Sequence, residues 1–480
     1  MPEITINSER KIYAAEGEIL LDVLRNAGIY ADAPCGGKGI CGKCGAKTGG
    51  KEILLCGTRV SGDMNITVDN AENGEYISGN FESDKYYAAV IDLGSTTVKV
   101  VFCDIESGRA VCGGSYMNVQ RMFGADVVSR VEYAVKNGAE KLFDLTRKQL
   151  DDIITGAFSR CGVSADRLAK IVVSGNTIME HIFCREDISG FGAYPFRPVF
   201  LKSRRMSARA LGYSFDAEIT VMPCASAFIG GDIVGGIMVC RRPGENALFA
   251  DIGTNAEAAV FCGERIYTAS AAAGPAFEGG RISCGAGCVG GAINHISMEN
   301  GMVSVSTINR KPSLGICGSG LTDAVAEFLK NGIIDNTGRF NPDNDYSRYM
   351  NEKGFNIIRD IYITQKDIRE IQTAKSAIYS GLAALAKDRG HMDVLYLCGG
   401  MGEYIDSENA KIIGLLPDFS PDTEIRRMGN TSVRGAAETL FCDKIDLAEE
   451  IALQCRETVL ADNEFFHDEF IKNMDFNYRY

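Results

Sequence analysis

The sequence has little of what nucleic-acid-binding and membrane proteins need. Lys and Arg number 50 against 63 Asp and Glu in 480 residues, which gives a formal net charge of −13. Phosphate backbones and anionic membrane surfaces repel such a chain, so neither nucleic acid nor a membrane is an expected partner. The most apolar stretch, residues 219–240, contains Pro223, Asp232 and four glycines, and we do not expect it to span a bilayer.

The sequence also lacks the charged and apolar segments of a secretory signal peptide, since residues 1–7 read MPEITIN. We therefore expect the 17 cysteines to lie in a reducing cytoplasm, where thiols serve as small buried residues, metal ligands or redox centres. Hydrophobic residues make up 45% and charged residues 24%, as in globular proteins. The length predicts about three domains.

Four cysteines near the N-terminus have the spacing of an iron-sulfur site. Cys35, Cys41, Cys44 and Cys56 form a C-x5-C-x2-C-x11-C pattern. Four thiolates hold a 2Fe-2S cluster, and plant-type ferredoxins use a similar run. Glycines between these cysteines allow backbone amides to approach the sulfurs. A four-cysteine zinc site is the alternative, although zinc ribbons usually carry two C-x2-C pairs and this stretch has one.

The segments around this loop predict an α+β domain. Residues 4–6 and 11–15 are expected to be strands, and residues 18–28 have apolar side chains at helical spacing. The order strand, strand, helix, cysteine loop is that of a β-grasp ferredoxin, which we place at residues 1–75. The polar, acidic stretch that follows predicts a linker at residues 76–86.

Two similar hairpins follow the linker. The segment 86–108 has two apolar runs around a tip that begins at Asp92, and a related segment has its tip at Asp251, 159 positions later. Each tip offers a carboxylate, a glycine that lets backbone approach a ligand, and hydroxyl or amide groups for phosphate oxygens. Facing each other across a cleft, the tips would bind a triphosphate and its magnesium. The remaining tip residues are Gly94, Ser95, Thr96, Thr97, Gly253, Thr254 and Asn255.

A third element lies at residues 394–405, where an apolar strand runs into Gly399, Gly400 and Gly402. We expect a flat turn there, which would pack against adenosine. In this order and spacing, the three elements resemble the phosphate and adenosine motifs of the actin, sugar kinase and heat-shock chaperone superfamily of ATPases. The resemblance implies a duplicated α/β ATPase domain with halves at residues 87–245 and 246–442, followed by a tail at residues 443–480.

Two further strings, GPAFEG (residues 274–279) and GICGSG (residues 315–320), are more specific. With the cysteine loop, they resemble the family of reductive activators of corrinoid-dependent enzymes, which join a 2Fe-2S ferredoxin domain to an ATPase of this superfamily. Longer members place a linker and a separate middle domain between these two parts. Because fewer than about twenty residues separate Thr67 from Tyr86, we expect this chain to tether its cluster more closely.

The resemblance implies ATP-dependent return of an oxidised Co(II) corrinoid protein to Co(I). The cysteines would hold the electron-donating cluster, while Asp92 and Asp251 would orient magnesium and the attacking water. Lys99 either points to the cleft or is a solvated strand lysine, and Glu278 either contacts nucleotide or metal or serves the turn. A corrinoid protein and a low-potential electron donor are the expected partners, and a homodimer is left open.

Other functions use the same motifs. An activator of another low-potential enzyme, such as a 2-hydroxyacyl-CoA dehydratase, shares the ATPase fold but holds a 4Fe-4S cluster between subunits. A small-molecule kinase with a fused redox sensor would phosphorylate an added acceptor, and an ATP-dependent chaperone would pass no electrons. Cys284, Cys288 and Cys317 could form a second metal site, although buried thiols are the simpler expectation. The four histidines are scattered, which favours structural roles.

Overall fold

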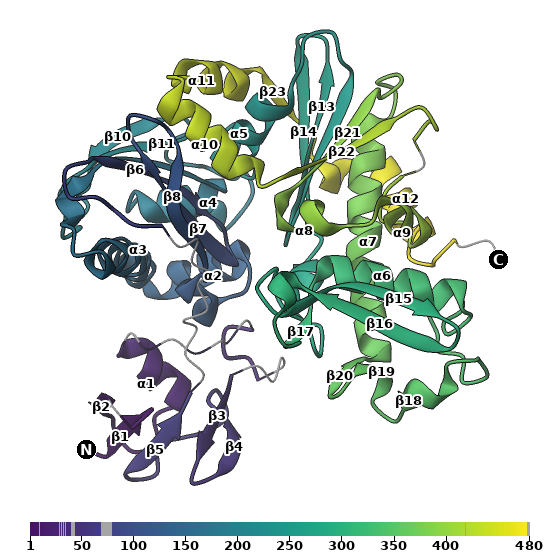
Figure 1. Cartoon of the computed structure of the whole chain (residues 1–480), viewed down its shortest axis with the longest axis horizontal. Coiled ribbons are helices and arrows are strands. Elements are labelled where there is room, and N and C mark those ends of the chain that lie inside the picture. Colours follow the sequence, from purple (N-terminus) through teal and green to yellow (C-terminus); the bar gives the residue numbers. More distant parts are fainter. Residues whose placement is uncertain are drawn as a thin grey trace. The chain divides into compact units, whose positions relative to one another are not determined.

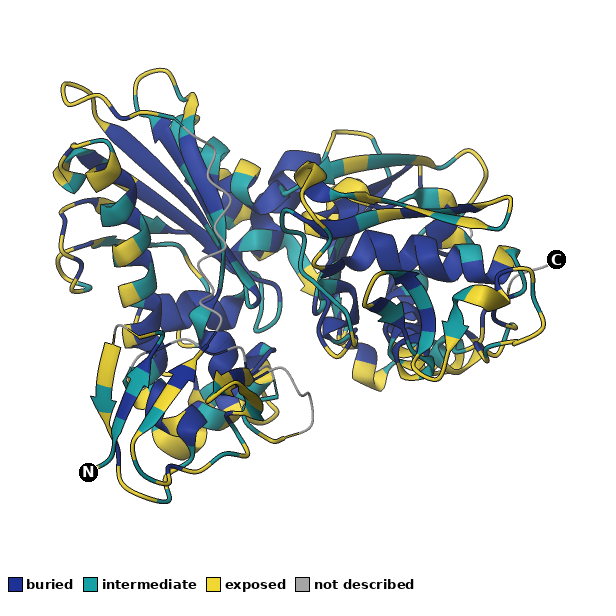
Figure 2. Ribbon diagram, turned by 60° about the horizontal axis from the view of Figure 1, so that its bottom comes forward, coloured by how far each residue is buried: buried dark blue, intermediate teal, exposed yellow. Residues whose placement is uncertain are grey.

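The computed structural model describes residues 1–8, 10–27, 29, 31, 33, 35–39, 44–68, 79–417 and 419–477. The chain forms two compact units, one of Met1–Phe200 with Arg204–Val221 and one of Leu201–Ser203 with Met222–Tyr480. Figure 1 labels their helices and strands. In both units the central strands are largely buried, and exposed residues gather in loops and on outer helix faces (Figure 2).

The N-terminal part of the first unit is a five-stranded sheet in the order β2-β1-β5-β3-β4. Strands β1 and β2 are antiparallel, as expected for the first hairpin, while β1 and β5 are parallel. Helix α1 is shorter than the predicted helix, and its apolar side chains Leu20, Leu21 and Leu24 pack into the core of this sheet. The elements are β1 (Glu3–Ile6), β2 (Arg10–Tyr13), α1 (Leu20–Asn26), β3 (Gly45–Thr48), β4 (Lys51–Leu54) and β5 (Met64–Thr67).

The second sheet of this unit has six strands in the order β10-β11-β9-β6-β7-β8. Strands β6, β7 and β8 form an antiparallel meander, and β9 joins the meander parallel to β6. The elements are β6 (Tyr87–Leu93), β7 (Thr97–Asp104), β8 (Ala110–Met117), α2 (Val127–Asn137), α3 (Glu140–Arg160), β9 (Leu168–Gly175), α4 (Thr177–Phe183), β10 (Arg204–Ser207) and β11 (Glu218–Val221).

Phe81 belongs to the core beneath this second sheet, although it lies in the segment expected to be a polar linker. Its side chain is 5% exposed and stacks on Phe158, with ring centroids 4.1 Å apart. It also meets the edges of Tyr87 and Phe102. Aromatic contacts of Phe81 therefore attach the residues just before β6 to the sheet. The acidic residues around Phe81 make this attachment hard to predict from the sequence.

The second unit repeats the meander and the two parallel strands beside it, as the two similar hairpins indicated, although its sixth strand lies at the opposite edge. Its six strands have the order β22-β21-β12-β13-β14-β23. Strands β12, β13 and β14 form an antiparallel meander, and β21 pairs parallel to β12. The sheet strands are β12 (Ala247–Ile252), β13 (Ala256–Cys262), β14 (Arg265–Ala271), β21 (Val394–Cys398), β22 (Glu424–Gly429) and β23 (Cys455–Glu457).

Two three-stranded sheets and several helices complete the second unit. Strand β15 lies between β16 and β17, and β19 lies between β18 and β20. The small strands are β15 (Ala292–Glu299), β16 (Met302–Thr307), β17 (Gly315–Ile316), β18 (Met350–Asn351), β19 (Gly354–Ile358) and β20 (Ile361–Ile363). The helices are α5 (Gly231–Cys240), α6 (Gly318–Lys330), α7 (Gln365–Ala386), α8 (Gly399–Tyr404), α9 (Ser407–Ile412), α10 (Thr431–Phe441), α11 (Ile445–Gln454) and α12 (Glu464–Lys472).

The expected flat glycine turn after β21 is instead the start of helix α8. Gly399 has a φ of +80°, which side chains rarely adopt, and this residue makes the sharp change of direction between strand and helix. Gly402 faces β21, because a Cβ there would lie 2.9 Å from the carbonyl carbon of Leu397. The glycines thus allow a short helix to fold tightly against its own strand.

The C-terminal tail is part of the core of the second unit. Phe476 is fully buried, and the ammonium group of buried Lys375 in α7 donates a 2.6 Å hydrogen bond to the carbonyl of Asp475. Helix α12 packs along α7. Throughout the described part of the chain, no helix is both long and apolar enough to cross a membrane.

Candidate functional site

Two of the predicted cluster cysteines lie at the same end of one hairpin. Cys44 directly precedes β3, and Cys56 lies two residues after the end of β4. Leu55, between β4 and Cys56, donates a 2.9 Å backbone hydrogen bond to the carbonyl of Cys44. Cys41 lies outside the described residues. Among the residues that are described, no three His, Cys, Asp or Glu side chains converge as a metal site.

The loop around Cys35 has a backbone that requires glycine. Gly36, Gly37 and Gly39 have φ values of +66°, +89° and +74°, in the region that other residues rarely occupy. The predicted role of these glycines in a tight ligand loop therefore agrees with the backbone, although that conformation alone does not identify the metal.

The first hairpin tip joins β6 to β7. Gly94 is required there, because a Cβ would lie 2.7 Å from the carbonyl oxygen of Thr97. Asn118 donates a 2.8 Å hydrogen bond from its amide to the carbonyl of Gly94. The guanidinium of fully buried Arg130 donates to the carbonyl of Ser95. These bonds hold the carbonyl groups of Gly94 and Ser95 in place. The backbone amides and hydroxyl groups of the tip are thereby held in a defined orientation.

Asp92 and Lys99 are direct cross-strand partners in this hairpin. Opposite residues on an antiparallel pair project from the same face of the sheet, so the two side chains share one face. Both are half-buried. Of the two predictions for Lys99, this register favours the one in which the ammonium group points toward the ligand side of the hairpin.

The second hairpin tip joins β12 to β13 in a tight turn, with a 2.9 Å hydrogen bond from the amide of Gly253 to the carbonyl of Asn255. Thr254 donates its hydroxyl hydrogen bond to the carboxylate of Glu278. A Cβ at Gly253 would lie 3.0 Å from the same carboxylate. Glu278 therefore supports the tip directly, which fits both of its predicted roles.

Gly399 lies against Asp251. Strand β21 pairs in parallel with β12 so that Cys398 is opposite Asp251, and the next residue, Gly399, passes close to the Asp251 carboxylate. A Cβ at Gly399 would lie 2.4 Å from one carboxylate oxygen of Asp251. Because Gly399 has no side chain, the carboxylate of Asp251 has room to lie against it.

Two further carboxylates lie near Asp251, and sequence reasoning missed both. Glu257 is its cross-strand partner on β13, and Asp232 lies in the first turn of α5. Enclosure by surrounding atoms, followed by the charges of Asp232 and Asp251, raises the pKa of Glu257 well above its usual range. Three carboxyl groups this close disfavour ionisation of all three at once, and a bound cation would relieve that cost. Alternation along the hairpin could have identified Glu257, but only with the pairing register known.

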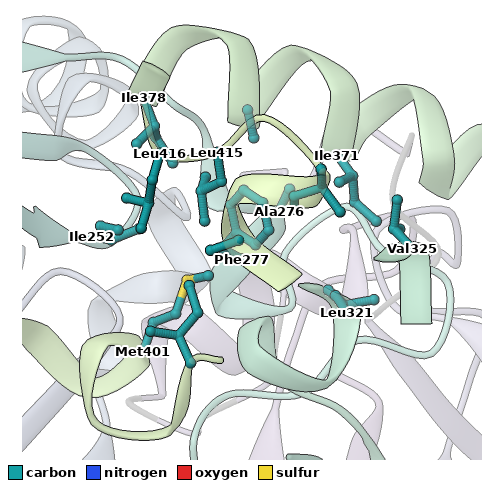
Figure 3. Close-up of a cluster of buried hydrophobic side chains, with 14 of the residues drawn as sticks. Ile252, Ala276, Phe277, Leu321, Val325, Ile371, Ile378, Met401, Leu415 and Leu416 are labelled. Carbon is teal, nitrogen blue, oxygen red and sulfur yellow. The ribbon is translucent and has the colours of Figure 1, made fainter. Parts of the chain in front are cut away.

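Buried neighbours position the site residues of the second unit. Ile252, Phe277 and Met401 are each at most 3% exposed and belong to one hydrophobic core (Figure 3). Ile252 directly precedes Gly253, and Phe277 directly precedes Glu278. Met401 lies between Gly400 and Gly402 of α8. Packing of these three buried side chains thus holds three separate stretches of backbone in place. The site residues next to them in the sequence are positioned by the same packing.

Two of the scattered histidines have the structural roles expected of them. The Nδ1 atom of His181 lies 2.7 Å from the carbonyl of Thr177, and its Nε2 atom accepts the backbone amide of Val199 at 3.0 Å. His295 lies 2.6 Å from the buried carboxylate of Asp323.

Comparisons with known proteins place these sites in a family. Residues 245–479 match the family model "C-terminal domain of RACo the ASKHA domain", and residues 87–242 match "RACo middle region". The second match corrects the expectation that this chain lacks the middle domain of longer relatives. The first includes the tail, in agreement with its burial in the second unit.

Two relatives share most of the chain. The protein named "Corrinoid activation enzyme RamQ" from Eubacterium limosum is 32% identical over 78% of this chain and 67% of its own length. A "[Co(II) methylated amine-specific corrinoid protein] reductase" from Methanosarcina barkeri is 25% identical over 81% of this chain and 77% of its own length.

The fold itself matches a solved structure titled "Reductive activator for corrinoid,iron-sulfur protein", with a TM-score of 0.77 and 24% identity over 100% of this chain and 99% of the other. The family match over residues 245–479 agrees with the predicted relationship to the actin and sugar kinase superfamily, since its description names the ASKHA domain. The chain therefore belongs to the RACo family of reductive activators of corrinoid proteins.

Proposed function

We propose that this protein uses ATP to drive the reduction of a Co(II) corrinoid protein to Co(I), with an electron passed from a 2Fe-2S cluster in its N-terminal domain. The single observation that carries the proposal is that one chain of the corrinoid activator family combines a ferredoxin-like cysteine loop with the two phosphate-type hairpins. A corrinoid protein is the proposed partner, and a separate low-potential donor would reload the cluster.

The described part of the N-terminal domain is compatible with the cluster. Cys44 and Cys56 lie at one end of the β3–β4 hairpin, and the backbone beside Cys35 has the positive φ values of a tight glycine loop. With Cys41, these residues would supply the four thiolates. A bound 2Fe-2S cluster would supply one-electron transfer. The protein's own contribution would be to hold the thiolates and to keep backbone amides near their sulfurs.

The two hairpin tips are the proposed ATP-binding elements. In the first unit, Gly94, Ser95, Thr96 and Thr97 would donate amide and hydroxyl hydrogen bonds to phosphate oxygens, and Lys99 would add a positive charge. In the second unit the corresponding residues are Gly253, Thr254 and Asn255, with Glu278 orienting Thr254.

Magnesium and adenosine have separate proposed contacts. Asp92 and Asp251 would hold magnesium, largely through water, and would orient the attacking water molecule. The carboxylates of Asp232 and Glu257 near Asp251 add to the attraction for a cation. Gly399, Gly400 and Gly402 would pack near the adenosine, now as the first turns of α8 instead of a flat turn.

ATP can drive an unfavourable electron transfer only if its binding and hydrolysis favour a state of the complex with a different interaction energy. For a one-electron step, 59 mV corresponds to a factor of ten, so a few kcal/mol would shift the equilibrium by on the order of 100 to 200 mV. The free energy available from nucleotide is therefore of the required size.

The test is an anaerobic visible spectrum of a Co(II) corrinoid protein mixed with the reduced protein, with and without Mg-ATP. We expect the Co(I) band only when ATP is present. Cys44→Ser should abolish Co(I) formation and lower the iron content, whereas Cys112→Ser, which replaces a buried cysteine of β8, should change neither. Iron retention with unchanged Co(I) formation in Cys44→Ser would refute the assignment of this cysteine.

A further inference from the structure

Two cysteines that the proposed electron transfer does not use lie side by side in the second unit. Cys288 is in the loop after Glu278, and Cys317 is the N-cap residue of helix α6. Cys288 packs against the small buried cluster that contains Cys317, and backbone hydrogen bonds of 2.8 and 2.9 Å join Ile316 to Cys284 and Ala286. Cys284, the third cysteine of the predicted metal site, instead directs its sulfur to the carbonyl of Asp360 at 3.6 Å. The structure therefore forms a pair of thiols here, without a third cysteine to complete a metal site.

The pair has the electrostatics of a reactive dithiol. The hydrogen bond from Cys288, together with the Ser319 hydroxyl and the backbone amides of Ser319 and Gly320, lowers the pKa of Cys317 to about 6. The same hydrogen bond, with burial, raises the pKa of Cys288. Cys317 is therefore the sulfur of the pair that more readily carries a negative charge. A thiolate at a helix N-terminus is the arrangement that supports thiol–disulfide exchange.

Access distinguishes this pair from a second one. Cys317 is fully buried but Cys288 is half-buried, so a small reagent can reach one of the two sulfurs. Cys240 and Cys398 are both fully buried, and burial raises the pKa of Cys398. These two described cysteines therefore provide a comparison that lacks the exposure of Cys288.

The exposed member lies beside the proposed nucleotide site. The sulfur of Cys288 is 3.7 Å from the carbonyl oxygen of Gly400. Its loop also packs against the backbone that follows Glu278, because a Cβ at Gly279 would lie 2.4 Å from the amide nitrogen of Ala286. Movement of Cys288 would therefore be transmitted to Glu278 and, through it, to Thr254.

The partner cysteine, by contrast, is held in place. A Cβ at Gly318 would lie 2.3 Å from the carbonyl of Phe277, and one at Gly320 would lie 2.3 Å from the carbonyl of Ile293. The start of α6 is packed so closely that Cys317 has little freedom to move. Closing a sulfur–sulfur bond of about 2.0 Å must therefore move the Cys288 loop, which changes its contact with Gly400.

We propose that Cys288 and Cys317 form a reversible disulfide that weakens nucleotide binding by the second unit; the effect on nucleotide rests on the ATP-binding function proposed above. The oxidant is a low-molecular-weight disulfide. Cys288 passes its proton to the Cys317 thiolate and attacks the external disulfide, forming a mixed disulfide and releasing one thiolate. Cys317 then gives up that proton, attacks the Cys288 sulfur and releases the second thiolate. One external disulfide is reduced as the two cysteines are oxidised; the proton of the pair passes to one released thiolate, and water protonates the other.

The first experiment maps the bond. The full-length protein is equilibrated anaerobically in buffers of reduced and oxidised glutathione, the remaining thiols are alkylated, and peptides are analysed by mass spectrometry. We expect a Cys288–Cys317 crosslink that dithiothreitol reverses and that is lost in Cys288→Ser and in Cys317→Ser. Absence of the crosslink at every glutathione ratio, or equal formation of a Cys240–Cys398 crosslink, would overturn the proposal.

The second experiment measures the binding of a fluorescent ATP analogue to reduced and oxidised protein. We expect the oxidised protein to bind about tenfold more weakly, and Cys288→Ala to show no difference after the same oxidation. Equal binding with the crosslink present would overturn the effect on nucleotide. If the reduced protein fails to bind the analogue, the ATP-binding function itself is refuted, and the crosslink experiment stands apart from that result.

Discussion

The two hairpin tips have the same backbone topology, but the residues across from their aspartates differ in chemical character. In the first unit the cross-strand partner of Asp92 is Lys99, whereas in the second unit the partner of Asp251 is Glu257. A cation beside the first tip suits phosphate oxygens, while added carboxylates beside the second suit a metal ion. The two loops are therefore similar in backbone, and one cross-strand residue in each makes the first better suited to phosphate and the second better suited to a metal ion.

The two tips are also supported in different ways. Asn118 and Arg130 bind the carbonyls of the first tip, so its support comes from the backbone. Glu278 binds the hydroxyl of Thr254 in the second tip, so its support includes a side chain that could itself contact a ligand. The first tip is the more rigid frame, and the second is the one whose geometry a ligand or a nearby loop can change.

The largest expected effect is that of Asp251→Asn. Loss of the carboxylate should remove a proposed magnesium contact from the more acidic tip and lower the rate of ATP hydrolysis by roughly 10²–10³-fold. Asp468→Asn, which changes an exposed residue of α12, should leave hydrolysis unchanged. A steady-state phosphate-release assay distinguishes them, and a rate within threefold of the parent for Asp251→Asn would remove this residue from the site.

Gly399→Ala should have the next largest effect, because its Cβ would collide with the Asp251 carboxylate. We expect ATP hydrolysis to fall by about tenfold or more, together with a loss of about 1–3 kcal/mol of stability from the positive φ. Gly390→Ala is the matched control, since Gly390 has a φ of +81° but open space around its Cβ position. It should lose similar stability and retain hydrolysis, so equal hydrolysis rates in the two variants would contradict the collision.

Replacing Lys99 and Glu257, the cross-strand partners of the two aspartates, should affect different kinetic parameters. Lys99→Gln should raise the KM for ATP by about tenfold, while Glu257→Gln should raise the magnesium concentration needed for half-maximal hydrolysis by about fivefold. Both titrations use the same hydrolysis assay, and Lys136→Gln, an exposed lysine of α2, should behave as the parent. If both variants change the same parameter by the same factor, the tips do not differ as proposed.

The smallest effects concern stability against pH, where each unit contains a buried base whose pKa is lowered. Burial lowers the pKa of His181 in the first unit to about 4, from an unfolded value of 6.5. Between these values the unfolded chain binds more protons, so stability should fall as pH drops from 6.5 toward 4. In His181→Gln, whose side chain can also donate and accept, this part of the pH dependence should disappear.

Lys375 in the second unit should act in the alkaline range. Burial lowers its pKa to about 8, from 10.5 in the unfolded chain, so the unfolded chain binds more protons between pH 8 and 10.5 and stability should rise across that interval. Chemical unfolding curves of the parent and Lys375→Met should differ in slope against pH by up to a few kcal/mol over the interval. Parallel curves would show that Lys375 is not held in its buried position.

Features that depend on neighbouring residues were predictable from the sequence. The hairpins at residues 86–108 and around Asp251, and the early strands and helix, follow from alternation and turn residues. The tail could not be assigned, because Lys375 meets Asp475 a hundred residues along the chain. The flat turn at Gly399 was wrong because a glycine run after a strand is equally compatible with a helix start.

The same limit applies to the sites. Cys288 and Cys317 were considered together with Cys284 because of their spacing, but only the fold shows which two thiols meet. Glu257 and Asp232 carry no recognisable motif, and their proximity to Asp251 follows from strand register and from the position of α5. Motifs therefore identified the loops, whereas the charges around them required the tertiary structure.

The parallel pairing of β1 with β5 has a consequence for how the protein is made. Ile4 pairs with Met64, so the first strand of the N-terminal sheet, already paired with β2, gains its second partner only when the ribosome has added sixty more residues. At about 5–20 residues per second, that interval lasts several seconds. All four proposed cluster cysteines are translated within it, so iron and sulfide could be delivered while the sheet that encloses them is still open at one side.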